Sequence, residues 1–244
     1  MAIIDEPLPV TGGAAKREYV RRVFSEIAPR YDLLNHVLSF NADRRWRRVA
    51  VDQMHWQDAP TGRYLDLCAG TLDLAAELGN RAGFRGHVVA ADFVTEMLRG
   101  GARKSLRVAP ATADALRLPF ADAVFDGASV GFGARNFMDL DAGLREAARV
   151  LKPGARFVVL EFSTPYWRPF RAIYLAYLRQ VLPRIGRVVS KHRSAYDWLP
   201  ASVLSFPEPA ALARRLEAAG FGPVTWRTLW GGIVAIHTAI RKDA

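Results

Sequence analysis

The sequence is poor in cysteine, since Cys68 is the single cysteine among 244 residues. One thiol excludes a disulfide within the chain and is typical of the reducing cytoplasm. No hydrophobic run approaches the ~20 residues that a membrane-spanning helix needs. The first eleven residues carry acids and prolines rather than an apolar segment, so they do not resemble a secretory signal. The sequence therefore predicts a cytoplasmic protein without a membrane span.

Two common signatures of cofactor sites are also missing. No group of cysteines and histidines has metal-ligand spacing, so no metal is expected. The turn after the first predicted strand of the sheet reads Ala69-Gly70-Thr71-Leu72, not Gly-x-Gly-x-x-Gly. Because that glycine pattern holds a pyrophosphate at a helix N-terminus, its absence argues against a dinucleotide site.

Acidic residues are outnumbered, and the formal net charge is +10. This charge favours an anionic partner, either nucleic acid or a membrane face with acidic lipids. The alternative is an arginine-rich composition that raises the charge everywhere, and the dense basic run at 44–48 can equally be a solvated helix face. No separate RNA-binding module is recognisable, and the aromatic residues near the predicted site lie in helices. A nucleic-acid partner is therefore not expected.

The hydrophobic pattern changes near residue 62. Residues 1–62 predict a tail and a helical cap, with one helix over 15–28. Residues 63–244 alternate short apolar strands with helices. The expected strands are 64–68, 87–92, 107–112, 124–130 and 156–162, and the expected helices include 71–79, 139–151 and 207–219. Such alternation predicts an α/β fold with a parallel sheet that is covered on both faces.

Two later segments depart from this alternation. Residues 224–230 and 233–240, joined at Gly231-Gly232, predict a terminal antiparallel hairpin. An insertion at about 166–200 contains a basic amphipathic helix that we expect to be interrupted near Pro183. This helix can pack on the sheet, cover an apolar pocket or contact a bilayer interface, and the sequence leaves these placements open.

Acidic side chains are expected at the carboxyl ends of three strands. Asp66 lies in the first strand, Asp92 ends the second and Asp114 follows the third. In such sheets, ligands bind at the carboxyl ends near the switch in strand order. Asp92 can accept both hydroxyls of a ribose, and Asp114 can accept the exocyclic amine of adenine. A nucleoside without phosphate fits this pattern, and S-adenosylmethionine is such a ligand. The sequence therefore predicts a class I, Rossmann-like methyltransferase fold.

Several motifs match one known family. They are Tyr31-Asp32 with Asn35, Gly70-Thr71, Leu118-Pro119-Phe120, Phe132-Gly133 with Arg135-Asn136, and Lys152-Pro153-Gly154 leading to Leu160-Glu161-Phe162-Ser163. The first and the fourth of these are much more specific than the motifs of the fold. On these residues the chain resembles the ubiquinone/menaquinone biosynthesis C-methyltransferase family over roughly residues 19–242. The resemblance implies methyl transfer from S-adenosylmethionine to a ring carbon of a polyprenylated quinol. Demethylmenaquinol is the favoured substrate, a ubiquinol precursor is the other, and S-adenosylhomocysteine is the second product.

We also assign cofactor contacts in the light of this resemblance. The expected cofactor-binding residues are Asp66, Gly70, Thr71, Asp92, Phe93, Asp114, Ala115 and Gly131. The family often has serine where this chain has Gly131, so a side-chain contact is lost there or moves to the backbone.

Four residues are candidates for the chemistry. A ring carbon becomes nucleophilic when the quinol hydroxyl is deprotonated, so Arg135 is expected to stabilise the phenolate. Asn136 would orient the ring oxygen or the cofactor, and Tyr31 and Asp32 of the cap could close over the pocket. Two of these residues have an alternative role: Arg135 can cap a carbonyl or pair with Asp139, and Tyr31 can be a core aromatic. His237 is expected in the core, or is the base if it faces the pocket.

Leu72 is the departure that bears most on function, because the family usually has glycine there. We expect its side chain to crowd the approach to the methionine part of the cofactor. A non-catalytic scaffold with a lost cofactor site, and a methyltransferase for another lipophilic molecule, remain alternative interpretations. A polyprenyl quinol also implies peripheral contact with an anionic membrane surface. Whether the chain forms a homodimer is left open.

Overall fold

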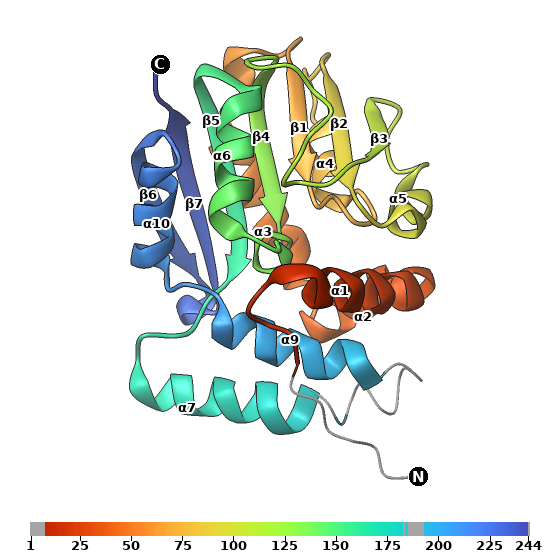
Figure 1. The fold of residues 1–244 in the computed structure, drawn as a ribbon, viewed down its shortest axis with the longest axis vertical. Helices are drawn as coiled ribbons and strands as arrows, with labels where there is room; N and C mark the ends of the chain where they lie inside the picture. Colours follow the sequence, from red (N-terminus) through yellow and green to blue (C-terminus); the bar gives the residue numbers. More distant parts are fainter. Residues whose placement is uncertain (1–7, 183, 185–192, 244) are drawn as a thin grey trace.

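The computed structural model describes residues 8–182, 184 and 193–243 (Figure 1). Seven strands of these residues form one sheet in the order β3-β2-β1-β4-β5-β7-β6. They are β1 (Arg63–Leu67), β2 (His87–Asp92), β3 (Val108–Thr112), β4 (Phe125–Gly131), β5 (Leu151–Phe162), β6 (Phe221–Leu229) and β7 (Val234–Arg241). Strands β1 to β5 are parallel, whereas β7 pairs antiparallel with both β5 and β6. The predicted parallel sheet and its terminal hairpin are confirmed.

Helices cover both faces of the sheet (Figure 1). One face carries α3 (Ala42–Gln53), α4 (Asp73–Gly79) and α5 (Thr95–Gly101), and the other carries α6 (Leu140–Val150) and α10 (Pro209–Ala218). Each face has its own apolar core: Trp46 and Leu78 are buried on the first side, and Leu144 and Leu216 on the second. The strands are apolar on both faces for this reason.

Strand β1 is the point at which the strand order reverses. It pairs with β2 on one side and with β4 on the other, so that Leu67 lies beside both Ala91 and Val130. This register brings the carboxyl ends of the three strands level. The turn after β1 and the loops after β2 and β4 therefore meet at one edge, where open α/β sheets bind ligands.

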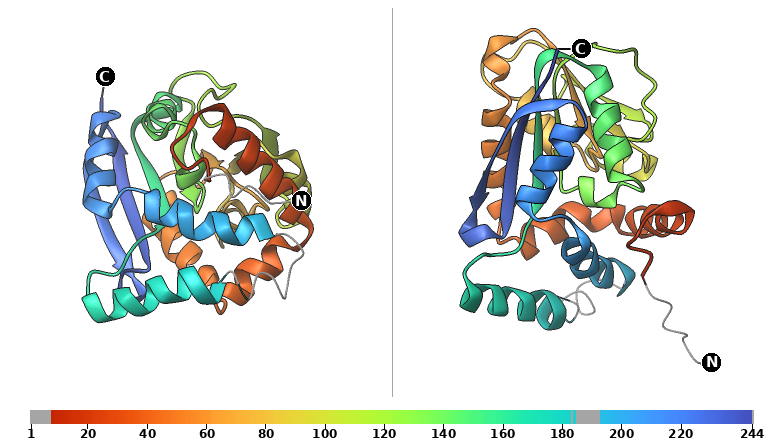
Figure 2. Two further views of the ribbon diagram at one scale, coloured as in Figure 1. Left: turned by 60° about the horizontal axis from the view of Figure 1, so that its bottom comes forward. Right: turned by 60° about the vertical axis from the view of Figure 1, so that its left-hand side comes forward.

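Helices of the cap and the insertion lie together beyond this edge (Figures 1 and 2). They are α1 (Gly13–Ile27), η1 (Ala28–Arg30), α2 (Tyr31–Leu38), α7 (Arg168–Ala176), the π-helical η4 (Tyr177–Val181) and α9 (Arg193–Ser205). Leu178 of η4 and Val203 of α9 are buried in one apolar cluster. Of the placements left open, the insertion therefore covers the ligand-binding edge. None of the described helices is long and apolar enough to cross a membrane.

The structure corrects three local expectations. The helix expected from residue 71 begins at Asp73, which leaves Thr71 in the turn. Lys152-Pro153-Gly154 was expected to separate a helix from a strand, but β5 already begins at Leu151, and the register with β4 shifts across this stretch. The helix α9 was not expected as a separate element, because Pro200 lies inside it. Pro183 lies outside the described residues.

Candidate active site

The turn after β1 is a series of left-handed residues. Cys68, Gly70 and Leu72 have φ values of 50°, 53° and 67°. The Gly70 N–H donates to Asp92 Oδ2 at 2.9 Å, and the Val94 N–H donates to Asp92 Oδ1 at 2.8 Å. Asp92 therefore fixes the turn after β1 to the end of β2. Burial raises the pKa of its carboxyl, while these backbone hydrogen bonds oppose the rise.

Asp66 lies beneath this turn and lines neither of the two cavities described below. Its carboxylate accepts hydrogen bonds from Ser129 Oγ at 2.8 Å and from the Ala75 N–H at 3.1 Å. Burial raises the pKa of Asp66 to about 7. These hydrogen bonds hold β1, β4 and α4 together, and contact between Asp66 and the cofactor stays a prediction.

A small cleft lies beside the turn, with a volume of about 20 Å³. Its lining includes Phe93, Asp114, Ala115 and Asn136. Arg17 of α1 also lines it and forms an ion pair with Asp114 at 3.0 Å. This volume holds about one water molecule and is too small for a nucleoside. A nucleoside can therefore enter only if side chains of the lining, such as Arg17, shift.

A second, large cavity of about 380 Å³ lies between the sheet and the cap. Helices α1, α2, α3, α7 and α9 contribute to its walls, which are mostly apolar. Its lining includes Phe24, Tyr31, Trp46, Phe132, Phe162, Tyr177 and Trp198. A cavity of this size and composition suits an apolar or aromatic ligand that is fixed by a few polar groups.

Two arginines, Arg135 and Arg47, line the large cavity. Arg135 is held by an acid of β5. Its Nη1 donates to Glu161 Oε1 at 2.8 Å, and its backbone N–H donates to Glu161 Oε2 at 3.2 Å. The guanidinium also lies 5.3 Å from the centre of the Phe162 ring. Nη1 also donates to the carbonyl oxygen of Phe132, so the alternative in which Arg135 caps a carbonyl is confirmed. The expected acid, Asp139, instead caps α6 by accepting from the Ala142 N–H. Arg135 is therefore fixed in the cavity wall.

Glu161 was missed as a site residue, although it is only 1% exposed and holds Arg135. The available signal was a single acid inside an otherwise apolar strand. An ionised carboxylate in such a position needs a cationic partner. The sequence shows the need for that partner but not which arginine supplies it.

The short helix η3 (Ala134–Asn136) separates the two cavities. Arg135 lines the large cavity, and the next residue, Asn136, lines the small cleft. Asn136 Oδ1 accepts a hydrogen bond from Trp198 Nε1 at 3.0 Å, which ties η3 to α9. Two ligands bound on either side of η3 would thus meet at these two side chains.

The two cap candidates have different surroundings. Tyr31 lines the large cavity, and burial raises the pKa of its hydroxyl. Asp32 lines neither cavity: it accepts from the Thr71 hydroxyl and pairs with Lys104 Nζ at 2.6 Å. Asp32 is therefore placed to hold the cap against the turn. Thr71 is buried, and its hydroxyl is engaged by Asp32.

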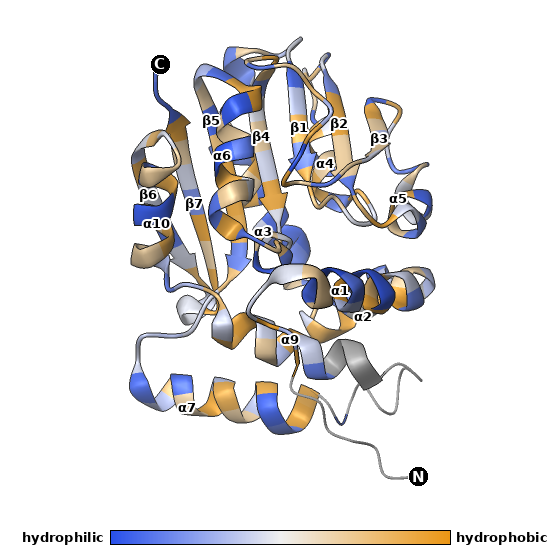
Figure 3. Ribbon diagram, in the orientation of Figure 1, coloured by the Kyte–Doolittle hydropathy of each residue, from blue (hydrophilic) through white to orange (hydrophobic). Residues whose placement is uncertain are grey.

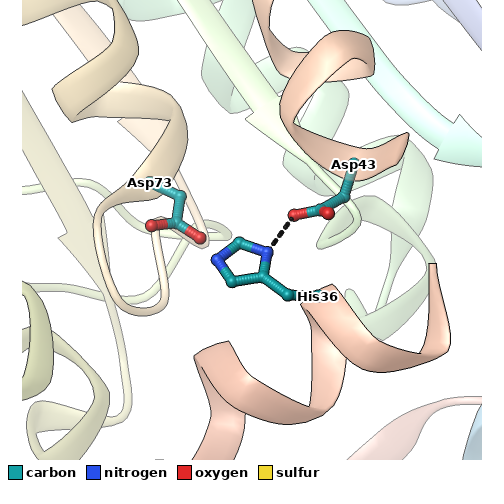
Figure 4. Close-up of side chains that lie close together, drawn as sticks. All are labelled: His36, Asp43 and Asp73. Atoms are coloured by element: carbon teal, nitrogen blue, oxygen red, sulfur yellow. Dashed lines mark hydrogen bonds and ion pairs between the residues drawn. The ribbon is translucent and has the colours of Figure 1, made fainter. Parts of the chain in front are cut away.

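His36, Asp43 and Asp73 surround one space between the cap and α4, with His36 Nδ1 2.9 Å from Asp43 Oδ2 (Figure 4). Burial opposes ionisation of Asp43, but hydrogen bonds from Ser39 and the charge of Arg47 lower the pKa of its carboxyl. Arg47 pairs with both Asp43 and Asp73, and Lys104 pairs with Asp73 at 2.5 Å. Protein cations thus already balance these carboxylates, which leaves little reason for a metal ion.

The Leu72 side chain lines neither cavity, and its expected crowding of the cofactor stays a prediction. Its side chain is 1% exposed and belongs to the core around α4. It packs against Gly101 of α5, where an added Cβ would lie 2.6 Å from Leu72 Cγ. At Gly131 an added Cβ would lie 3.0 Å from Leu74 Cδ2, so a larger residue there requires Leu74 to shift.

His237 is a core histidine rather than a base at the site. It lines neither cavity, and its Nε2 lies 2.9 Å from the carbonyl oxygen of Pro209. Burial lowers the pKa of its imidazole to about 4. The ring is therefore neutral at physiological pH.

The sheet, with its terminal antiparallel hairpin and helices on both faces, defines a class I, Rossmann-like methyltransferase fold. An S-adenosylmethionine-dependent methyltransferase from Thermotoga maritima is similar, with a TM-score of 0.61, 17% identity and coverage of 91% of this chain and 99% of that one. The cyclase SpnF is also similar, with a TM-score of 0.70, 17% identity and coverage of 97% and 99%. These likenesses confirm the predicted fold, and the cyclase illustrates that the fold alone does not decide the reaction.

Sequence comparison then identifies the family. A profile described as the ubiE/COQ5 methyltransferase family matches residues 13–241. Demethylmenaquinone methyltransferases from Mycolicibacterium gilvum and Thermus thermophilus are 47% and 49% identical. The alignments cover 91% and 90% of this chain, and 94% and 100% of those relatives. The chain belongs to the ubiE/COQ5 methyltransferase family, and the resemblance seen in its motifs is confirmed.

Proposed function

We propose that this methyltransferase uses S-adenosylmethionine to methylate a ring carbon of demethylmenaquinol, a polyprenylated quinol, in menaquinone biosynthesis. One observation carries the proposal. A large apolar cavity with a buried arginine meets a carboxylate-bearing cleft at two consecutive residues, Arg135 and Asn136. The relatives are named for methylation of demethylmenaquinone, and a cavity of aromatic side chains suits such a ring.

The adenosine part of the cofactor is assigned to the small cleft. Asp114 lines this cleft and offers its carboxylate to an amine group. Asp92 does not line the cleft, and its two oxygens accept from the Gly70 and Val94 N–H groups. A carboxylate can accept about four hydrogen bonds, so Asp92 keeps acceptor capacity for the hydroxyls of a ribose. Phe93 and Ala115 offer apolar contact to a base. The chemistry of these groups fits a nucleoside without phosphate. Gly70 provides a turn into which a ligand can approach the backbone, with Tyr31 nearby.

The large cavity is assigned to the quinol. When bound, S-adenosylmethionine supplies the methyl group that the ring carbon takes, with release of the thioether and, from the ring, one proton. Arg135 stabilises negative charge on the quinol oxygen, and Glu161 keeps the guanidinium in place. The apolar walls exclude water, and Asn136 orients groups at the junction.

The mouth of the large cavity is assigned to an anionic membrane surface. Phe40, Ile173 and Trp230 line the cavity and are also exposed. Tyr166 and Trp167 are exposed just before α7, along which hydrophobic and hydrophilic residues are mixed (Figure 3). Arginines on this segment are exposed as well: Arg168, Arg171, Arg179 and Arg184. Aromatic residues and arginines together are typical of surfaces that lie at a membrane interface.

Quinone analysis in a bacterial strain that lacks its own demethylmenaquinone methyltransferase tests this function. Expression of the chain should convert the accumulated demethylmenaquinone into menaquinone. The matched control is Arg135→Lys, which keeps the charge but loses the planar contacts to Glu161 and should reduce conversion. If the wild-type chain is expressed and folded and demethylmenaquinone still accumulates, the proposed substrate is wrong.

A further inference from the structure

Tyr174 is a buried residue that lines the large cavity. It belongs to α7 and is 6% exposed. Its hydroxyl has no hydrogen-bond partner among the residues that the structure describes. A buried hydroxyl without a partner is costly, so such groups are uncommon without a reason. Phenylalanine would fill the same space without this cost.

A second unpartnered donor lies in the same wall. Arg135 Nε is also buried without a partner in the described part of the chain, although Nη1 of the same guanidinium is bound to Glu161. The charges of Arg135 and Glu161 act on the Tyr174 hydroxyl, so the three groups share one region. Burial raises the pKa of Tyr174, which keeps its proton available for donation.

We propose that Tyr174 is a substrate-binding residue that donates a hydrogen bond to one ring oxygen of the quinol, while Arg135 holds the other oxygen. This inference rests on the proposed function and adds to it the basis of ring orientation. A 1,4-quinol carries two oxygens on opposite ring carbons. Three side chains that line the cavity carry a buried donor without a partner in the described part of the chain: the Tyr174 hydroxyl, Arg135 Nε and Trp46 Nε1. Of these, Tyr174 and Arg135 are the pair that interact electrostatically. Arg135 takes the oxygen beside the reacting carbon, because the phenolate must form there. Tyr174 binds the remote oxygen and thereby determines which ring carbon faces η3.

Tyr177 provides a matched control. It follows Tyr174 by one helical turn and lines the same cavity, but its hydroxyl donates to the carbonyl oxygen of Leu38 at 3.5 Å. Replacement of either tyrosine by phenylalanine removes one oxygen and keeps the ring. The two variants therefore separate the hydroxyl of Tyr174 from packing in this helix.

The test is a binding titration that does not depend on turnover. Trp46, Trp198 and Trp230 line the cavity, so their fluorescence reports ligand binding. The probes are a reduced, short-chain prenylated 1,4-naphthoquinol and the corresponding naphthol, which lacks the oxygen remote from the reacting carbon. For the wild type and Tyr177→Phe, the naphthol should bind about tenfold more weakly than the quinol. For Tyr174→Phe, the two probes should bind equally within about twofold.

Two outcomes overturn the inference. In one, Tyr174→Phe discriminates between the probes as well as the wild type does. In the other, the wild type itself binds both probes equally. Neither result depends on methyl transfer. A chain that binds the quinol through Tyr174 but never methylates it would instead contradict the proposed function and leave the inference standing.

Discussion

At the scale of single residues, Leu72 combines a strained backbone with a buried side chain. Its φ of 67° and ψ of 18° are left-handed values that cost a non-glycine residue roughly 1–2 kcal/mol. Its side chain is part of the core, and loss of a buried leucine side chain costs about 2–5 kcal/mol. The packing term is larger, so leucine is a workable replacement for the glycine of the family.

Leu72→Gly should therefore destabilise the protein by about 2 kcal/mol in urea unfolding, because lost packing outweighs relieved strain. Its affinity for S-adenosylmethionine, measured by calorimetry under native conditions, should stay within about twofold of the wild type, since Leu72 lines neither cavity. A gain in affinity of tenfold or more would mean that the leucine does obstruct the cofactor.

The lowered pKa of His237 predicts that the stability of the protein depends on pH. The folded pKa of about 4 lies below the ordinary value near 6.5, so between these values the unfolded chain binds more protons. Stability from this residue is complete above pH 6.5 and is lost as the pH falls toward 4, by roughly 3 kcal/mol. His237→Gln does not titrate and can still donate to Pro209. As the pH falls from 6.5 to 4, the free energy of unfolding of the wild type should decrease by this amount relative to that of the variant. A difference between the two proteins that does not change with pH would refute the assignment.

Sequence reasoning found the residues whose position is set by strand ends, and missed those set by packing. Asp92 and Asp114 were predictable because a carboxyl end of a parallel strand is a fixed place in this fold. Tyr174 lies in the segment that was predicted to contain a basic amphipathic helix, and that pattern does not show that the residue lines a cavity with its hydroxyl unpartnered. The hydrogen bonds of Asp66 could not be predicted, because the sequence pattern of an acid in a strand is the same whether the acid contacts a ligand or a neighbouring strand.

At the scale of elements, α1 controls access to the small cleft. Lys16 Nζ donates to the carbonyl oxygens of Arg135 and Phe137, at 3.0 and 2.7 Å, and so fixes α1 to η3. Arg17, the next residue, pairs with Asp114 in the cleft. Any adenosine that reaches Asp114 must compete with this arginine. The sequence predicted the helix correctly but gave no sign of its contact with the cleft.

Arg17→Ala should tighten binding of S-adenosylmethionine by about two- to fivefold, because the exposed ion pair that competes for Asp114 is worth at most about 1 kcal/mol. Arg21→Ala is the control, since it removes the same charge from an exposed position of α1. Calorimetric titration of both variants measures the effect. Weaker binding by Arg17→Ala than by Arg21→Ala would show that Arg17 is a cofactor ligand instead.

At the scale of the whole molecule, the helices of the cap and the insertion add a large apolar cavity to a fold that many methyltransferases share. The sheet and its helices were predictable from the alternation of apolar strands and helices. The cavity was not, because its walls come from α1, α2, α7 and α9, which are far apart in the sequence. Part of the net charge of +10 lies on α7 and η4, whose arginines are exposed.

The chain should bind vesicles that contain anionic phospholipid at low salt, and release from them as the salt concentration rises. Two exposed tryptophans allow a matched comparison: Trp167 before α7 is 69% exposed, and Trp226 on β6 is 43% exposed. Trp167→Ser should weaken vesicle binding by about tenfold through lost apolar burial, whereas Trp226→Ser should not. Equal effects in a sedimentation assay would place the membrane contact elsewhere.

The most direct test of the account is methyl transfer by the purified chain. Demethylmenaquinol in detergent micelles is incubated with S-adenosylmethionine that carries a deuterated methyl group, and the products are analysed by mass spectrometry. The account predicts menaquinol with one labelled methyl group on a ring carbon, formed in equal amount with S-adenosylhomocysteine. A chain that binds S-adenosylmethionine but leaves the quinol unchanged, or that places the label on oxygen, would contradict it.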